Sequence, residues 1–183
     1  MPRLLVFAAL LLTVAACDST DSLLGEFVGR VTVGDASRPV EGEAVYTVVE
    51  TADGPEFVLG LFVGDLFDSD REDYDYVLFR RWGGVPGPGG YAVDDDPTRA
   101  FGATIAAVED ADEPLDATGA VLAGVDGTLA ITSVDSYGFM AGTYRFTAEG
   151  LALGAPGRTV QGAASGVFEA RYERPEVFAR IGL

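Results

Sequence analysis

The chain has 183 residues, the length of one domain, and carries 29 acidic against 12 basic residues for a formal net charge of −17. So acidic a surface repels nucleic-acid phosphates, and we expect no nucleic-acid partner. The sequence contains no histidine and no lysine, which excludes a Ser-His-Asp triad, an imidazole base and a Schiff-base lysine. No cofactor is indicated.

The first residues have the features of an export signal. Arg3 supplies a positive charge, and residues 4–16 are almost entirely apolar, a run too short for a transmembrane helix of about 20 residues. The run ends in the motif VAAC at residues 14–17. This motif resembles the lipobox of bacterial lipoprotein signal peptides, an aliphatic residue and two small residues before a cysteine. The resemblance implies that Cys17 becomes the lipid-bearing first residue of the mature protein.

Cys17 is the only cysteine of the chain. Exported proteins normally pair their cysteines or avoid them, so a lone cysteine at the cleavage boundary is suited to lipid attachment. The alternative is an ordinary cleaved signal followed by a chance cysteine. We expect a signal peptide (1–16), a lipidated cysteine with a polar tether (17–25) and a single domain (26–183). Acyl chains such as palmitate would then hold the protein in the cell envelope, at the periplasmic or surface face of the outer membrane. Asp18 leaves the inner membrane as an alternative.

The first part of the domain predicts three strands. Apolar and polar residues alternate with period 2 over residues 27–33, 44–49 and 57–63, which is the pattern of half-buried strands. Asp53-Gly54 separates the last two of these runs. Because Asp-Gly readily adopts positive φ angles, we expect a hairpin over residues 44–63 with a type I′ turn.

An acidic segment follows the third strand. Hard calcium ions favour such oxygen-rich loops, but the spacing is not that of an EF-hand, because Asp73 occupies the position of the required glycine. We therefore expect a solvated acidic loop, with a calcium site as the alternative. The acidic residues are Asp68, Asp70, Glu72, Asp73 and Asp75.

Aromatic residues and arginines gather around a Gly/Pro-rich run. Residues 74–81 predict a strand, and the run at 83–90 is not expected to continue a ladder. Aromatic faces beside arginine donors can bind a sugar or another planar or anionic ligand. The alternative is packing in the core or at its rim, and for Trp82 we expect a core anchor. The candidate ligand-binding residues are Tyr74, Tyr76, Arg81, Trp82 and Tyr91.

The remainder of the chain predicts further strands. Strand-like runs occupy 99–108, 127–134, 139–148 and 159–172, with a tight connection at 135–138. Glycines recur within these strands and indicate bulges or strong coiling, as in a closed or highly twisted sheet. They are Gly142, Gly162 and Gly166. The C-terminal segment 175–183 predicts one short helix or a terminal strand.

The same C-terminal stretch resembles a pattern in small uncharacterised β-rich lipoproteins of Bacteroidota and related bacteria. The matching segments are GTLAIT at 127–132, GTYRFTA at 142–148 and GVF at 166–168. The resemblance implies a β-rich envelope lipoprotein and no particular chemistry. From the residues themselves we expect one all-β, mostly antiparallel domain of about eight to ten strands, a sandwich or a barrel with mainly hairpin and meander connections.

Two classes of function remain. The first is a non-enzymatic envelope lipoprotein that binds a small ligand, a glycan or a protein partner. The second is a carboxylate-based hydrolase acting on glycan, because a pair of carboxylates about 5 to 10 Å apart can cleave a glycosidic bond. The carboxylates considered for that role are Glu41, Glu43, Glu50 and Glu56. The missing catalytic groups favour the first class.

Overall fold

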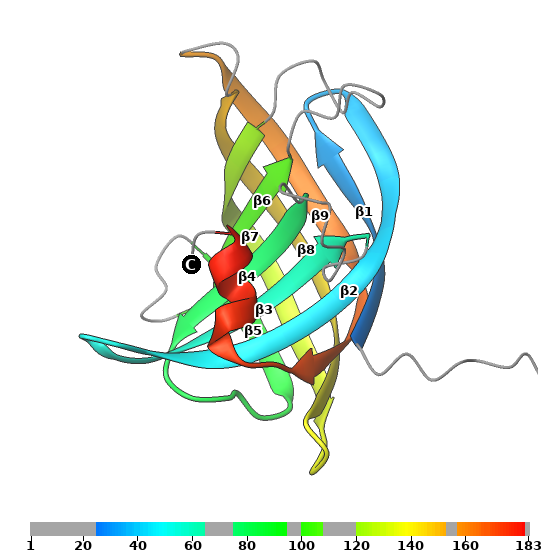
Figure 1. Cartoon of the computed structure of the whole chain (residues 1–183). Helices are drawn as coiled ribbons and strands as arrows, with labels where there is room; N and C mark the ends of the chain where they lie inside the picture. The colour runs from blue at the N-terminus through cyan, green and yellow to red at the C-terminus, as the bar shows by residue number, and fades with distance from the viewer. Residues whose placement is uncertain (1–24, 65–74, 95–99, 108–119, 153–156, 182–183) are drawn as a thin grey trace, which may run out of the picture.

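The computed structural model describes residues 25–64, 75–94, 100–107, 120–152 and 157–181, and shows a closed β-barrel (Figure 1). Eight antiparallel strands close it in the order β1-β2-β3-β4-β6-β7-β8-β9, with β9 pairing back to β1. β5 is an additional strand beside β7. The prediction of an all-β antiparallel domain is confirmed, and of the two architectures considered the barrel is the one adopted.

The strands are β1 (Gly25–Val33), β2 (Ala36–Thr51), β3 (Gly54–Val63), β4 (Tyr76–Trp82), β5 (Gly89–Val93), β6 (Gly102–Ala107), β7 (Ala120–Val134), β8 (Phe139–Ala152) and β9 (Thr159–Tyr172). A 3-10 helix, η1 (Pro175–Ile181), follows β9, so the helical alternative holds for this segment. In the part of the chain that the structure describes, no helix is long and apolar enough to cross a membrane.

The predicted hairpin is confirmed, but its predicted turn type is wrong. Thr51 and Gly54 face each other across β2 and β3. A type I′ turn would require positive φ at both residues between them, Ala52 and Asp53, whereas every positive φ among the described residues belongs to a glycine. Gly54 has a φ of 114° and is the first residue of β3, not a central turn residue.

Gly54→Val is expected to lower the free energy of unfolding by about 1 to 3 kcal/mol, because a β-branched residue resists positive φ. No atom lies within 4 Å of a Cβ built at Gly54, so the cost arises from the backbone. Gly90→Val is the matched control, since Gly90 has equally open surroundings without a positive φ. Chemical denaturation compares the two variants, and equal midpoints would show that the φ of Gly54 is not constrained.

One other expectation requires correction. The Gly/Pro run leaves the ladder only over residues 83–88, because Gly89 and Gly90 already belong to β5.

The interior glycines of β8 and β9 were expected to indicate bulges or strong coiling, as in a closed or highly twisted sheet, and the sheet is closed. The β8–β9 register is continuous, and the two irregularities lie in β7, at Gly124/Asp126 and at Ile131/Ser133, the second of them opposite Gly142. The glycines make room for large neighbours, as at Gly142, where a Cβ would lie 2.5 Å from the Phe168 ring.

The inward side chains fill the barrel with an aromatic core. An eight-stranded barrel is just wide enough for side chains to occupy its interior. Phe79 lies near its middle, with its ring centroid 5.7 Å from that of Tyr144 and 5.5 Å from that of Phe146. Other fully or almost fully buried rings are those of Phe27, Phe57 and Phe101. The ligand surfaces considered below therefore lie on the outside of the barrel.

η1 covers part of the outer surface. Phe178 of η1 is fully buried and packs with Val45 of β2, Phe62 of β3 and Leu78 of β4 in a second apolar cluster. Figure 1 shows the short helix lying across these strands. This face is closed by the chain itself, whereas the faces described next are open.

Candidate functional site

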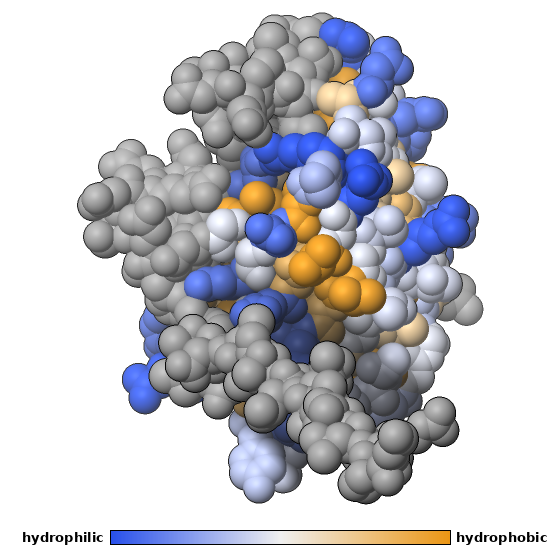
Figure 2. Space-filling model, turned by 90° about the vertical axis from the view of Figure 1, so that its right-hand side faces the viewer, coloured by the Kyte–Doolittle hydropathy of each residue, from blue (hydrophilic) through white to orange (hydrophobic). Residues whose placement is uncertain are grey.

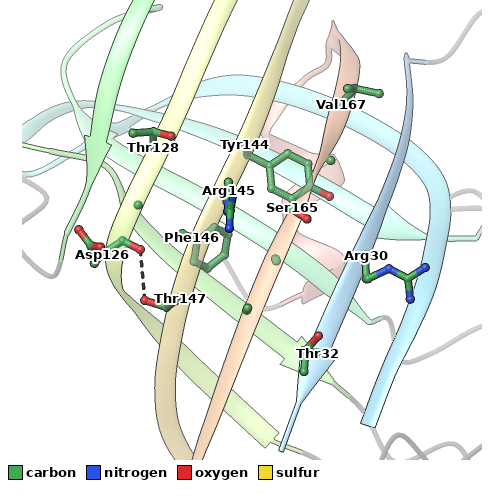
Figure 3. Close-up of a pocket in the computed structure, with 14 residues that line it drawn as sticks. Arg30, Thr32, Asp126, Thr128, Tyr144, Arg145, Phe146, Thr147, Ser165 and Val167 are labelled. Carbon is green, nitrogen blue, oxygen red and sulfur yellow. Dashed lines mark hydrogen bonds between the residues drawn. The ribbon is translucent and has the colours of Figure 1, made fainter. Parts of the chain in front are cut away.

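An open groove of about 810 Å³ lies on the outer face of β1, β7, β8 and β9 (Figure 3). Its polar lining comes from strands that are far apart in the sequence but adjacent in the barrel. Hydroxyl and guanidinium groups dominate it, together with one carboxylate: Arg30, Thr32, Asp126, Thr128, Arg145, Thr147 and Ser165. A volume of this size falls within the range of small-molecule sites in proteins, about 300 to 1,000 Å³.

The sheet register aligns the centre of the groove in one transverse row. Thr128 of β7 pairs with Arg145 of β8, Arg145 pairs with Ser165 of β9, and Ser165 pairs with Arg30 of β1. Adjacent strands lie about 4.8 Å apart. The backbones of the two arginines are therefore roughly 10 Å apart with Ser165 between them.

Neither arginine of this row has a hydrogen-bonding or ionic partner among the described residues, whereas Arg38 and Arg80 are ion-paired with carboxylates. Both side chains are exposed. A guanidinium presents planar donors that match carboxylate, sulfate or phosphate oxygens. In a chain with a net charge of −17, two cations without a described partner give this row a local positive charge, although the carboxylate of Asp126 also lines the groove.

The wall beneath the row is tightly packed. Tyr144 points inward from β8. A Cβ built at Gly166 would lie 2.7 Å from the Tyr144 hydroxyl oxygen, and a Cβ built at Gly29 would lie closer still. Only glycine therefore fits at these two positions, next to Arg30 and Ser165. The hydroxyl is buried without a partner in the described residues, and burial raises the pKa of Tyr144, so it remains a neutral phenol. This packing fixes the backbone that carries the row.

An apolar pair borders the arginine row. Val28 and Val167 face each other across β1 and β9, and 57% and 55% of their surfaces are exposed. They lie two residues along each strand from Arg30 and Ser165, on the same face. Figure 2 views the molecule from the right-hand side of Figure 1, and it shows an apolar patch next to polar residues on that face. The surface thus offers both charged and apolar contacts.

A smaller hollow of about 310 Å³ lies on the outer face where β4, β6 and β7 meet. Trp82 lines it and is half-buried outside both apolar clusters, so the expectation that Trp82 is a core anchor is wrong. Glu56 and Arg80 line it as an ion pair: Nε donates to Oε1 at 2.9 Å and a terminal guanidinium nitrogen donates to Oε2 at 2.7 Å. Asp94 and Thr104 complete the polar lining.

The structure divides the aromatic residues that the sequence suggested as one site. Arg81 lies over the Tyr91 ring at 5.2 Å, so these two are together. Trp82 points to the opposite face of β4 from Arg81, into the hollow. The ring centroid of Tyr76 lies 6.1 Å from that of Phe62, so Tyr76 packs beside the apolar cluster under η1. Tyr74 lies outside the described residues.

Most of the acidic segment, Asp68, Asp70, Glu72 and Asp73, also lies outside the described residues. Asp75 is nearly buried and forms an ion pair with Arg38. Among the residues with described positions, no three acidic or cysteine side chains are grouped so as to hold a metal ion. Because four of the five residues of the calcium alternative lie outside the described residues, that alternative stays a prediction.

The glutamates considered for hydrolysis are spread over β2 and β3. Glu41 and Glu43 lie on the outer face of β2, and Glu50 is near the hairpin end of the same strand. Glu56 lies in the hollow, with both carboxylate oxygens occupied by Arg80. Asp94, which lines the same hollow, is not among the carboxylates that the sequence suggested for hydrolysis.

Sequence reasoning missed Arg30, Arg145 and Ser165. The alternation around Arg145, between inward Tyr144 and Phe146, marks an outward side chain but not its neighbours. Only the pairing of β8 with β9 and of β9 with β1 brings the three residues together.

The fold and the groove define a closed, antiparallel β-barrel with a filled interior and an open outer surface that carries two arginines without a partner among the described residues. Comparison with protein-family models, with curated proteins and with solved structures found no significant match.

Proposed function

We propose that this protein is a lipid-anchored envelope protein that binds an acidic glycan in its outer groove without catalysing a reaction. The observation that carries the proposal is the row in which unpaired Arg30 and Arg145 flank Ser165. The signal sequence and Cys17 support the envelope location, and the filled barrel supports a ligand site on the outside.

The chemistry of the groove suits an acidic sugar chain better than a small inorganic anion. The arginines are far enough apart to contact charges on different parts of one extended ligand. Ser165 and Thr128 offer hydroxyls with no hydrogen bond to described residues, and hydroxyls can both donate to and accept from those of a sugar. The exposed valines beside the row can contact the apolar face of a sugar ring.

The double substitution Arg30→Gln and Arg145→Gln is expected to weaken binding of an acidic oligosaccharide about 100-fold. A hydrogen bond to a charged group contributes roughly 1.5 to 3 kcal/mol, and each 1.4 kcal/mol is about tenfold in affinity. Isothermal titration of the full chain with oligogalacturonate measures this, with maltohexaose as the neutral comparison. Arg174→Gln, which removes an exposed arginine outside the groove, is the control. Unchanged binding of oligogalacturonate by the double variant, or an equal loss of maltohexaose binding in that variant, would contradict the proposal.

Glycan hydrolysis is the second candidate function, because Glu56 and Asp94 line one hollow. A hydrolase would release reducing ends from glycan, and Glu56→Gln would abolish that release. Arg80 donates a hydrogen bond to each carboxylate oxygen of Glu56. This favours a role for Glu56 as a fixed hydrogen-bond acceptor for a bound sugar over a role as a catalytic carboxylate.

A further inference from the structure

We propose that the hollow beside Trp82 is a second binding site, which takes a neutral pyranose sugar. It differs from the outer groove in position, residues and charge. Either proposal can fail while the other stands.

The hollow arises from a change of strand partner. β7 pairs with β6 as far as Ala123 and with β5 from Gly127 onward. The β7–β8 ladder is irregular between Gly124 and Asp126, where one residue of β7 is left out of register. Such bulges bend a strand and redirect its side chains. The strands separate here, and the hollow of about 310 Å³ opens between them.

Trp82 supplies an apolar wall. It is the only tryptophan of the chain, and it lines the hollow while remaining half-buried. A tryptophan offers a large rigid apolar face that loses little conformational freedom on binding. The C–H face of a pyranose ring is a suitable partner for such a wall. Gly102 and Gly124 also border the hollow, and a Cβ at Gly124 would point toward the core, 2.9 Å from the Cβ of Ala103.

The Glu56–Arg80 pair supplies matched polar contacts. The Glu56 side chain is only 8% exposed, whereas that of Arg80 is 44% exposed. Arg80 fixes the carboxylate through two hydrogen bonds and keeps further N–H donors. Neighbouring sugar hydroxyls each donate and accept, so one can donate to a Glu56 oxygen while the next accepts from Arg80. Thr104 provides a further hydroxyl.

The charge of the hollow favours a neutral ligand. Among the described lining residues, Glu56 is acidic and nearly buried, and the guanidinium of Arg80 is already paired with it. An anionic sugar would meet the Glu56 carboxylate, and the described lining offers it no unpaired cation. We therefore expect the hollow to reject the acidic sugars that the groove binds.

The test uses the emission of Trp82 in the full chain, held in a detergent without a sugar head group. Because the chain has one tryptophan, the signal reports on this hollow alone. Titration with the methyl pyranosides of glucose, galactose, mannose and N-acetylglucosamine is expected to give a saturable blue shift with at least one of them. The shift should persist in 0.5 M sodium chloride, a setting in which screening leaves neutral contacts intact.

Variants then locate the site by saturation-transfer NMR, which needs no tryptophan. Trp82→Ala is expected to weaken binding of the responding sugar about tenfold or more, through loss of the stacked face. Glu56→Gln should also weaken it, whereas Tyr137→Ala, which removes a ring that is 87% exposed elsewhere, should not. Circular dichroism confirms that each variant is folded. The Arg30→Gln/Arg145→Gln variant should bind the neutral sugar normally.

Three results would overturn the inference. One is the absence of a saturable response to any of the four sugars. Another is unchanged sugar binding by folded Trp82→Ala. The third is a response to tetramethylammonium but to no sugar, which would show that the acidic groups and the indole form a cation site instead.

Discussion

Phe79→Ala is expected to lower the free energy of unfolding by about 3 to 5 kcal/mol, the usual cost of truncating a buried phenylalanine. Phe79 is fully buried near the middle of the barrel. Its ring meets those of Tyr144 and Phe146 edge to face, and such contacts add roughly 0.5 to 1.5 kcal/mol each beyond burial. The loss is large compared with a typical domain stability of about 5 to 15 kcal/mol.

Chemical denaturation of the full chain measures this loss. Tyr137→Ala is the control, because its ring is 87% exposed and its removal should change the stability by less than about 0.5 kcal/mol. Equal unfolding midpoints for the two variants would mean that the interior is not packed as described. Phe79→Leu should recover part of the loss by refilling some of the cavity.

Cys17→Ser is expected to abolish lipid attachment and to release the protein from membranes or leave it unprocessed. A serine hydroxyl does not replace the thiol in the thioether to diacylglycerol. Each buried methylene of an acyl chain contributes about 0.8 kcal/mol, so two or more chains anchor a protein firmly and a polar tether alone does not. Metabolic labelling with a clickable fatty acid and membrane fractionation measure both effects. Continued incorporation of label into the serine variant would contradict the assignment of Cys17.

Local sequence patterns predicted much of the fold. The run 159–172 became β9 with the same bounds, because inward Val160, Ala164 and Phe168 alternate with polar or small residues. Two period-2 runs on either side of Asp53-Gly54 predicted the hairpin of β2 and β3. The positive φ lies at Gly54, however, and not at Ala52 and Asp53, where a type I′ turn would require it. Both features depend on interactions between residues close in sequence.

Features that depend on long-range pairing could not be predicted. Gly89 and Gly90 have poor strand propensity, yet they form β5 because the exposed edge of β7 pairs with them. Trp82 is a large aromatic residue of the kind expected in a core. The alternation of inward and outward side chains along β4 nevertheless places it on the outer face, beside the hollow. The row of Arg30, Ser165 and Arg145 exists only because the barrel closes between β1 and β9.

NMR chemical-shift mapping of the labelled full chain during titration with oligogalacturonate tests the acidic-glycan proposal most directly. We predict that the largest changes cluster in the groove, at the amides of Arg30, Arg145 and Ser165, and that 0.5 M sodium chloride reduces them by screening the arginine contacts. Small changes are expected at Trp82, because the described lining of the hollow holds the Glu56 carboxylate and offers an anionic sugar no unpaired cation. Changes centred on the Arg81–Tyr91 end of the barrel, or none in the groove at saturating glycan, would contradict the proposal.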